Sequence, residues 1–233
     1  MSTTPGWRRV TSRRRVLTLL AGTAAIATWP VTWAMAAQRR IRAICRDAWG
    51  ARPPSGKLRA HSIVRVTVHH SGVGFWDNRR APARFRSHQA SHQAQGWPDI
   101  AYHLLIDRHG HVYRGRPLWA RGDTATNYNP RGHLSVMCEG NFQKQSPTDA
   151  QVSALIDVLA WACVKHDLPL YRIKGHRDFA ATACPGDRLY RLLDDGSIRR
   201  RVRRRIKAGG VSLRTICGDA GDRLVARIER GDA

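Results

Sequence analysis

Alternating apolar and polar positions between residues 64 and 70 predict a β-strand. Successive side chains of a strand point to opposite faces of the sheet. One face would carry Val64, Val66 and Val68 toward a core, and the other would carry Arg65, Thr67 and His69. His69 and His70 are therefore expected on opposite faces of the sheet.

The segments 102–107 and 111–116 flank a His109-Gly110 turn, and this arrangement predicts a β-hairpin. Its first strand would carry Tyr102, Leu104 and Ile106 on one face. Residues 117–132 follow with Gly, Pro, Asn and Asp but no periodicity, which is typical of a long loop that carries binding residues. Further strands are expected at 133–139 and 170–174, and helices at 79–95, 148–166, after Pro185-Gly186 and at 199–207.

Two of these helices have clear signals. Thr148 and Gln151 have the spacing of a capping box, and apolar residues follow at helical spacing. In the run 199–207, seven of nine residues are Arg or Lys, while Ile198, Val202 and Ile206 form a narrow apolar stripe. We expect this helix to end at Gly209-Gly210. The basic run is either a solvated helix face or a clamp for anionic lipid or wall polymer.

The chain has 233 residues and a formal charge of +23, from 40 Lys and Arg against 17 Asp and Glu. A hydrophobic content of 42% excludes wholesale disorder. The charge predicts an anionic partner, and the absence of zinc-finger, RNP and helix-turn-helix patterns argues against nucleic acid. Five cysteines at irregular spacing indicate no disulfide framework. Cys184 is the candidate free thiol, and Cys45 has either Cys163 or Cys217 as a possible partner.

The first 37 residues have the pattern of a twin-arginine export signal. Ser12-Arg13-Arg14-Arg15 precedes an uncharged run from Val16 to Gln38, and Ala34-Met35-Ala36 has the pattern of a cleavage site. A retained membrane anchor is the alternative. Removing residues 1–37 takes away five arginines and no acids, which leaves a charge of +18. We expect export across the cytoplasmic membrane to the periplasm, the cell wall or the medium.

His176 and Cys184 lie eight residues apart within Gly175–Gly186 and form a candidate half of a metal site. Zinc accepts imidazole nitrogen and thiolate sulfur together, and a hydrolytic site needs a third protein ligand. His69, at a strand end on the polar face, is the better third ligand, and His70 is expected to be a packed or hydrogen-bonded neighbour. The alternative is a buried inert cysteine beside a surface histidine. Asp178 is a candidate to orient a ligand imidazole. Glu139 is either a base, a partner of a ligand, or a carboxylate on the rim.

With these residues in place, the chain resembles the zinc-dependent N-acetylmuramoyl-L-alanine amidases shared by peptidoglycan recognition proteins and phage amidases. The resemblance covers roughly residues 41–193. It rests on Arg46-Asp47-Ala48-Trp49-Gly50-Ala51-Arg52, Val68-His69-His70-Ser71, Gly96-Trp97-Pro98-Asp99-Ile100-Ala101-Tyr102, Val112-Tyr113-Arg114-Gly115-Arg116, Tyr128-Asn129, Glu139-Gly140-Asn141-Phe142, Gly175-His176-Arg177-Asp178 and Cys184-Pro185-Gly186. The family's usual His in the loop before Tyr-Asn is Thr124 here, and its stem-peptide discriminator falls on Pro117 and Leu118.

The resemblance implies an α/β fold with a central mixed β-sheet flanked by helices, which we expect over residues 38–195. The composition of residues 196–233 predicts a basic C-terminal extension. The resemblance implies an enzyme that cuts the amide between N-acetylmuramic acid and L-alanine in peptidoglycan or muropeptides. We expect the protein to be a monomer. The implied zinc ligands are His69, His176 and Cys184, the implied catalytic residues are Tyr102 and Thr182, and the implied substrate contacts are Ser71, His92 and Asn129. A non-catalytic peptidoglycan-binding protein is the alternative, and the retained Cys184 and Tyr102 favour the enzyme.

Overall fold

The computed structural model describes residues 1–3 and 38–233, and residues 38–233 belong to one compact unit. The expected twin-arginine motif and cleavage site lie outside the described residues. Among the residues described, no helix has both the length and the apolar character needed to cross a membrane.

A seven-stranded sheet forms the centre of the unit, with the strand order β6-β2-β5-β3-β4-β1-β7. The strands are β1 (Arg39–Ile44), β2 (Arg65–His70), β3 (Leu104–Ile106), β4 (Val112–Arg114), β5 (His133–Cys138), β6 (Ile173–Gly175) and β7 (Val211–Ile216). All neighbouring pairs are parallel except β3 and β4, which form the predicted antiparallel hairpin. The expected α/β fold with a mixed sheet is confirmed.

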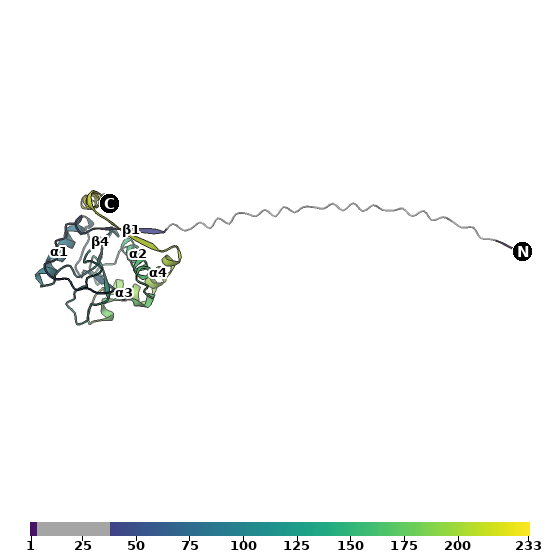
Figure 1. Cartoon of the computed structure of the whole chain (residues 1–233), viewed down its shortest axis with the longest axis horizontal. Coiled ribbons are helices and arrows are strands. Elements are labelled where there is room, and N and C mark those ends of the chain that lie inside the picture. Colours follow the sequence, from purple (N-terminus) through teal and green to yellow (C-terminus); the bar gives the residue numbers. More distant parts are fainter. Residues whose placement is uncertain (4–37) are drawn as a thin grey trace. The chain divides into compact units, whose positions relative to one another are not determined.

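Helices cover both faces of the sheet (Figure 1). On one face, α2 (Asp149–Lys165), α3 (Asp187–Asp194) and α4 (Ser197–Lys207) pack over a core that contains Val66, Val68 and Leu104. On the other face lie α1 (Ala81–Ala94) and α5 (Gly218–Arg230). Three short 3-10 helices complete the fold: η1 (Asn78–Arg80), η2 (Leu170–Arg172) and η3 (His176–Asp178).

Local signals explain where α2 and α4 begin and end. The Thr148 hydroxyl accepts a hydrogen bond from the Gln151 amide, and the Gln151 side chain accepts one from the Thr148 amide, so the predicted capping box is present. In α4, Ile198 and Val202 are buried against the core, as their spacing predicts. The helix ends just before Gly209, which has a left-handed φ of 100°.

Two predicted side-chain orientations are wrong. Val64 is 46% exposed, because β2 begins only at Arg65 and Val64 lies before the regular alternation. Tyr102 does not share a face with Leu104 and Ile106; it packs with the cluster on the α1 side of the sheet. The reason is that β3 begins at Leu104, so residues 101–103 are irregular and the two-residue period does not extend back to Tyr102.

The C-terminal segment belongs to the same sheet rather than forming a separate extension. Strand β7 pairs in parallel with β1 along the whole register from Arg39↔Val211 to Ile44↔Ile216. The sequence analysis predicts neither strand, because three of the six residues of β1 are arginines and β7 is a short segment whose partner, β1, lies far away in the sequence. The amide of Cys45 donates to the carbonyl of Ile216, which places Cys45 beside Cys217 rather than Cys163. All five cysteines are free thiols.

Candidate metal centre

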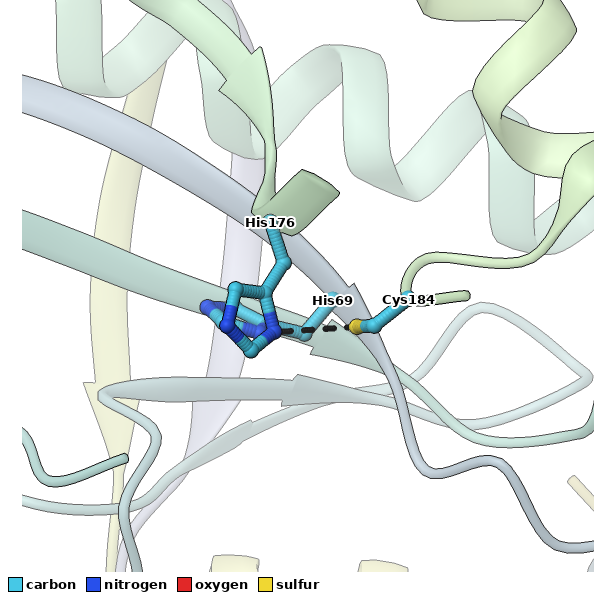
Figure 2. Close-up of side chains that lie close together, drawn as sticks. All are labelled: His69, His176 and Cys184. Atoms are coloured by element: carbon cyan, nitrogen blue, oxygen red, sulfur yellow. Dashed lines mark hydrogen bonds between the residues drawn. The ribbon is translucent and has the colours of Figure 1, made fainter. Parts of the chain in front are cut away.

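Two histidines meet because β2 and β6 are parallel neighbours. Val68 pairs with Gly175 in the sheet, so His69 of β2 and His176, which directly follows β6, lie side by side at the carboxyl ends of the two strands. Their ring centroids are 4.7 Å apart. Figure 2 shows the two rings and the side chain of Cys184 directed at a common point.

Cys184 completes the triad from the turn between η3 and α3. Its Sγ lies 3.6 Å from Nδ1 of His69 and accepts a hydrogen bond of 3.4 Å from the His70 amide. The candidate ligand atoms of His69, His176 and Cys184 all lie within 4.8 Å of one another. The structure therefore brings together the three residues that the sequence analysis proposes as ligands.

The donor set fits zinc. On a tetrahedral zinc ion, sulfur at about 2.3 Å and nitrogen at about 2.0 Å from the metal are roughly 3.5 Å apart. The distance of 3.6 Å between Cys184 Sγ and His69 Nδ1 matches this tetrahedral edge. Two imidazoles and one thiol also leave a fourth position for water or substrate, as hydrolytic zinc sites require.

Burial sets the protonation of the triad. It lowers the pKa of both His69 and His176, and the neighbouring His176 lowers that of His69 further, so both imidazoles are neutral at neutral pH. Burial raises the pKa of Cys184 to about 12, against smaller lowering effects from the His70 amide and Arg177. Since metals bind the thiolate, binding a cation here would release the thiol proton.

A threonine that sequence reasoning missed orients His176. Nε2 of His176 lies 2.6 Å from the Thr126 hydroxyl, which is itself 2.8 Å from the hydroxyl of Thr124. A hydrogen bond at Nε2 leaves Nδ1 of His176 free for a metal. The sequence carries no signal for Thr126, because the 117–132 loop has no periodicity. The role proposed for Asp178 is wrong: its carboxylate accepts from the Gly175 amide and the Tyr190 hydroxyl.

The neighbouring His70 points to the other side of β2. Its Nδ1 accepts a hydrogen bond of 3.2 Å from the Phe142 amide, and its ring lies 5.9 Å from the Phe142 ring. His70 is therefore the packed, hydrogen-bonded neighbour that strand alternation predicts.

Tyr102 and His92 line the α1 side of the triad. The Tyr102 ring centroid lies 5.2 Å from that of His69 and 5.7 Å from that of His92. Burial raises the pKa of Tyr102 above its usual range, so its hydroxyl keeps its proton. Burial also lowers the pKa of His92 to about 4, and the Ala101 amide donates to its Nδ1. Neutral His92 therefore carries its proton on Nε2.

The other predicted site residues differ in how they are held. The Thr182 hydroxyl accepts a hydrogen bond of 3.2 Å from the Cys184 amide and so supports the turn that carries the thiol. Ser71 lies just beyond β2 and donates to Glu139. Asn129 is exposed, and its side-chain oxygen accepts from the Arg131 amide. Its neighbour Tyr128 instead packs on His176, with ring centroids 5.2 Å apart.

Glu139 belongs to a second polar cluster at the same end of the sheet. Its carboxylate is fully buried, which excludes the rim position considered from the sequence. Oε1 accepts a hydrogen bond of 2.9 Å from Ser71, and Oε2 lies 2.7 Å from Nε2 of His88. The Arg84 guanidinium lies 3.7 Å from the same carboxylate. Both carboxylate oxygens therefore have partners within the protein.

Comparisons with known proteins agree with this geometry. Residues 59–187 match the family model described as N-acetylmuramoyl-L-alanine amidase. A human N-acetylmuramoyl-L-alanine amidase is 37% identical over 182 residues, which cover 75% of this chain and 31% of the human protein. The chain thus spans about a third of the length of that relative.

Solved structures show the same fold. Drosophila peptidoglycan recognition protein SD has a TM-score of 0.61 and 30% identity, covering 66% of this chain and 94% of its own. Peptidoglycan recognition protein LE, solved in complex with tracheal cytotoxin, a monomeric diaminopimelic acid-type peptidoglycan, has a TM-score of 0.60 and 27% identity. That match covers 66% of this chain and 92% of the recognition protein.

Proposed function

This chain belongs to the N-acetylmuramoyl-L-alanine amidase family, and from that premise we propose that it hydrolyses the amide between N-acetylmuramic acid and L-alanine in peptidoglycan or muropeptides. The observation that carries the proposal is the convergence of His69, His176 and Cys184, with candidate ligand atoms within 4.8 Å of one another. We propose zinc as the cofactor, held by these three side chains.

Zinc would supply a Lewis acid for the substrate carbonyl and would lower the pKa of water to about 7. The protein's own contribution begins with Tyr102. Because its hydroxyl stays protonated, it is a neutral donor for the negative charge that develops on the carbonyl oxygen. Donors of this kind contribute roughly 2.7–4 kcal/mol to transition-state stabilisation.

Substrate positioning is assigned to the residues around the triad. His92 presents a protonated Nε2, because its Nδ1 is occupied by the Ala101 amide. Thr182 uses its oxygen lone pair for the Cys184 amide, which leaves its hydroxyl proton for a substrate carbonyl. Ser71 and Asn129 stay candidate substrate contacts, and the hydroxyl of Ser71 is directed at Glu139 in this structure.

A peptidoglycan-binding protein without catalysis is the second candidate, because the matched solved structures are those of peptidoglycan recognition proteins. The two candidates differ at the thiol. A purely binding site has no need for a partly buried Cys184 at a zinc-compatible distance from His69, and this observation favours the enzyme.

Zinc removal and restoration test the proposal. The purified protein is incubated with soluble muropeptides before and after chelation, and peptides with a free L-alanine amino terminus are measured by mass spectrometry. We expect release that stops after chelation and returns with one equivalent of zinc. Muropeptide binding without release in the zinc-loaded protein would instead establish the recognition role.

We also propose that the protein reaches peptidoglycan by twin-arginine export. The support is the sequence around Arg13 and Arg14 with the uncharged run that follows. Fractionation of cells that produce the wild type and an R13K/R14K variant tests this. Export of the variant at the wild-type level would contradict the proposal.

A further inference from the structure

Helix α4 presents a dense basic face that the proposed reaction does not use. Six arginines and one lysine occupy positions 199–207. Of these seven cations, only Arg205 forms an ion pair within the described part of the chain, and its partner is Asp157. Arg199 and Arg200 donate to the carbonyls of Asp194 and Asp195 at the end of α3. The remaining cations, Arg201, Arg203, Arg204 and Lys207, are exposed.

This charge pattern opposes helix stability. Four pairs of like charges stand four residues apart in α4, and such pairs destabilise a helix. The first turn contains no acidic residue, so arginines also face the positive end of the helix dipole. A solubilising face would alternate acids and bases at these positions. The pattern is therefore better explained by an anionic partner than by the needs of folding.

A cleft lies beside this basic surface, at the start of α4. The cleft has a volume of about 440 Å³ and is lined by Leu170, Tyr171, Gly196, Arg199, Arg200 and Arg203. Tyr171 is 63% exposed, and the Arg172 guanidinium lies 5.4 Å from its ring centroid. Three guanidinium groups beside an exposed aromatic ring suit a phosphate attached to a polyol or sugar.

We propose that α4 and this cleft bind a linear phosphodiester polymer of the cell wall, made of polyol or sugar phosphate units. The proposal rests on the proposed function, which brings the protein to peptidoglycan. Arginine forks match phosphate oxygens, and a helix of 11 residues extends over about 16 Å, so it contacts several successive phosphates. A bilayer fits less well, because Ile198 and Val202 of the α4 apolar stripe are buried in the core and cannot insert into a membrane.

Substitutions that replace arginines of α4 with neutral glutamine test this inference. R201Q/R203Q/R204Q removes three exposed arginines without removing a hydrogen bond, and R223Q/R227Q/R230Q on α5 is the control with the same loss of charge. Both are made in the C184S background, so that walls stay undigested. Binding is measured with purified poly(glycerol phosphate), and by sedimentation with purified walls before and after hydrofluoric acid removes their phosphodiester polymers.

We expect the α4 variant to bind poly(glycerol phosphate) at least tenfold more weakly at 0.15 M salt, and the α5 control to match its parent. The slope of log affinity against log salt should fall by about 2, at roughly 0.7 per phosphate contact. Stripped walls should lose α4-dependent binding. Equal loss in both variants, unchanged binding to stripped walls, or α4-dependent binding only to phosphatidylglycerol vesicles or duplex DNA would overturn the proposal.

Cleavage of soluble muropeptides by R201Q/R203Q/R204Q with Cys184 intact separates this inference from the proposed function. We expect turnover equal to wild type, because α4 lies outside the triad. A wild type that binds the polymer but is inactive would reject the proposed amidase activity and support the polymer site. A wild type that is active but does not bind the polymer would support the amidase activity and reject the polymer site.

Discussion

Two polar clusters lie at the same end of the sheet, and they differ in how their polar atoms are satisfied. In the Glu139 cluster, the buried carboxylate has partners on both oxygens, from Ser71 and His88. In the triad, neutral His69 and a thiol with a raised pKa face one another at 3.6 Å. The first cluster is complete within the protein, whereas the second has unused ligand capacity. Proximity of polar groups is therefore a weaker sign of a metal site than unused donor atoms.

The largest expected effect is a difference in zinc binding and activity between alanine variants of the adjacent residues His69 and His70. His69→Ala should lose zinc and reduce muropeptide turnover by at least about 10³-fold, because two protein ligands rarely hold a hydrolytic zinc. His70→Ala is the matched control, since His70 accepts from the Phe142 amide on the other face of β2. It should keep its zinc, measured by metal analysis of purified protein. Equal zinc loss in both variants would contradict the assignment by strand face.

Tyr102→Phe should lower the rate of the chemical step without changing the zinc content. Loss of one neutral donor lowers kcat by about 10²–10³-fold. Zinc content and melting temperature should match the wild type, because the ring contact with His69 remains. Steady-state kinetics on a soluble muropeptide would measure this. A rise in KM with unchanged kcat would show that Tyr102 serves binding alone.

Thr126→Val should weaken zinc binding by about 10–100-fold, the usual effect of removing a hydrogen-bond partner of a metal-binding histidine. The cause is the loss of the contact between Thr126 and His176 Nε2, which otherwise fixes the ring. Competition with a chelator of known affinity measures the change. Thr126→Ser, which keeps the hydroxyl, should restore the wild-type value.

Glu139→Gln should leave the zinc content unchanged and should lower the free energy of unfolding. A neutral amide keeps the shape but weakens the bonds to Ser71 and His88, at a cost of about 1–3 kcal/mol in the free energy of unfolding. Urea denaturation provides the free energy, and metal analysis should show one zinc per chain. Zinc loss in this variant would mean that the two clusters act as one site.

The sequence predicts the parts of the fold that have strong local signals. The capping box at Thr148 and the hairpin around His109 both form, and strand alternation separates His69 from His70. Strands β1 and β7 escape prediction, because three of the six residues of β1 are arginines and both strands form by pairing with segments far away in the sequence. Short-range patterns therefore determine individual elements, whereas pairing between distant segments does not show in them.

The site is predicted unevenly for the same reason. His69, His176 and Cys184 follow from residue type and strand position, and the structure brings them together. Thr126 and the burial of Glu139 depend on how a loop and a helix fold over the strand ends, and no sequence period encodes that. Tyr102 is found by resemblance but assigned to the wrong face, because the chain is irregular at residues 101–103.

The most direct test of the central claim is the comparison of wild type and Cys184→Ser in one muropeptide digest. Serine keeps the size of the side chain but is a poor zinc ligand. Peptides with a free L-alanine amino terminus are quantified by mass spectrometry at equal protein concentration. The triad predicts release by the wild type and a loss of at least about 10³-fold in the variant. Equal release by the two proteins would contradict the zinc amidase assignment.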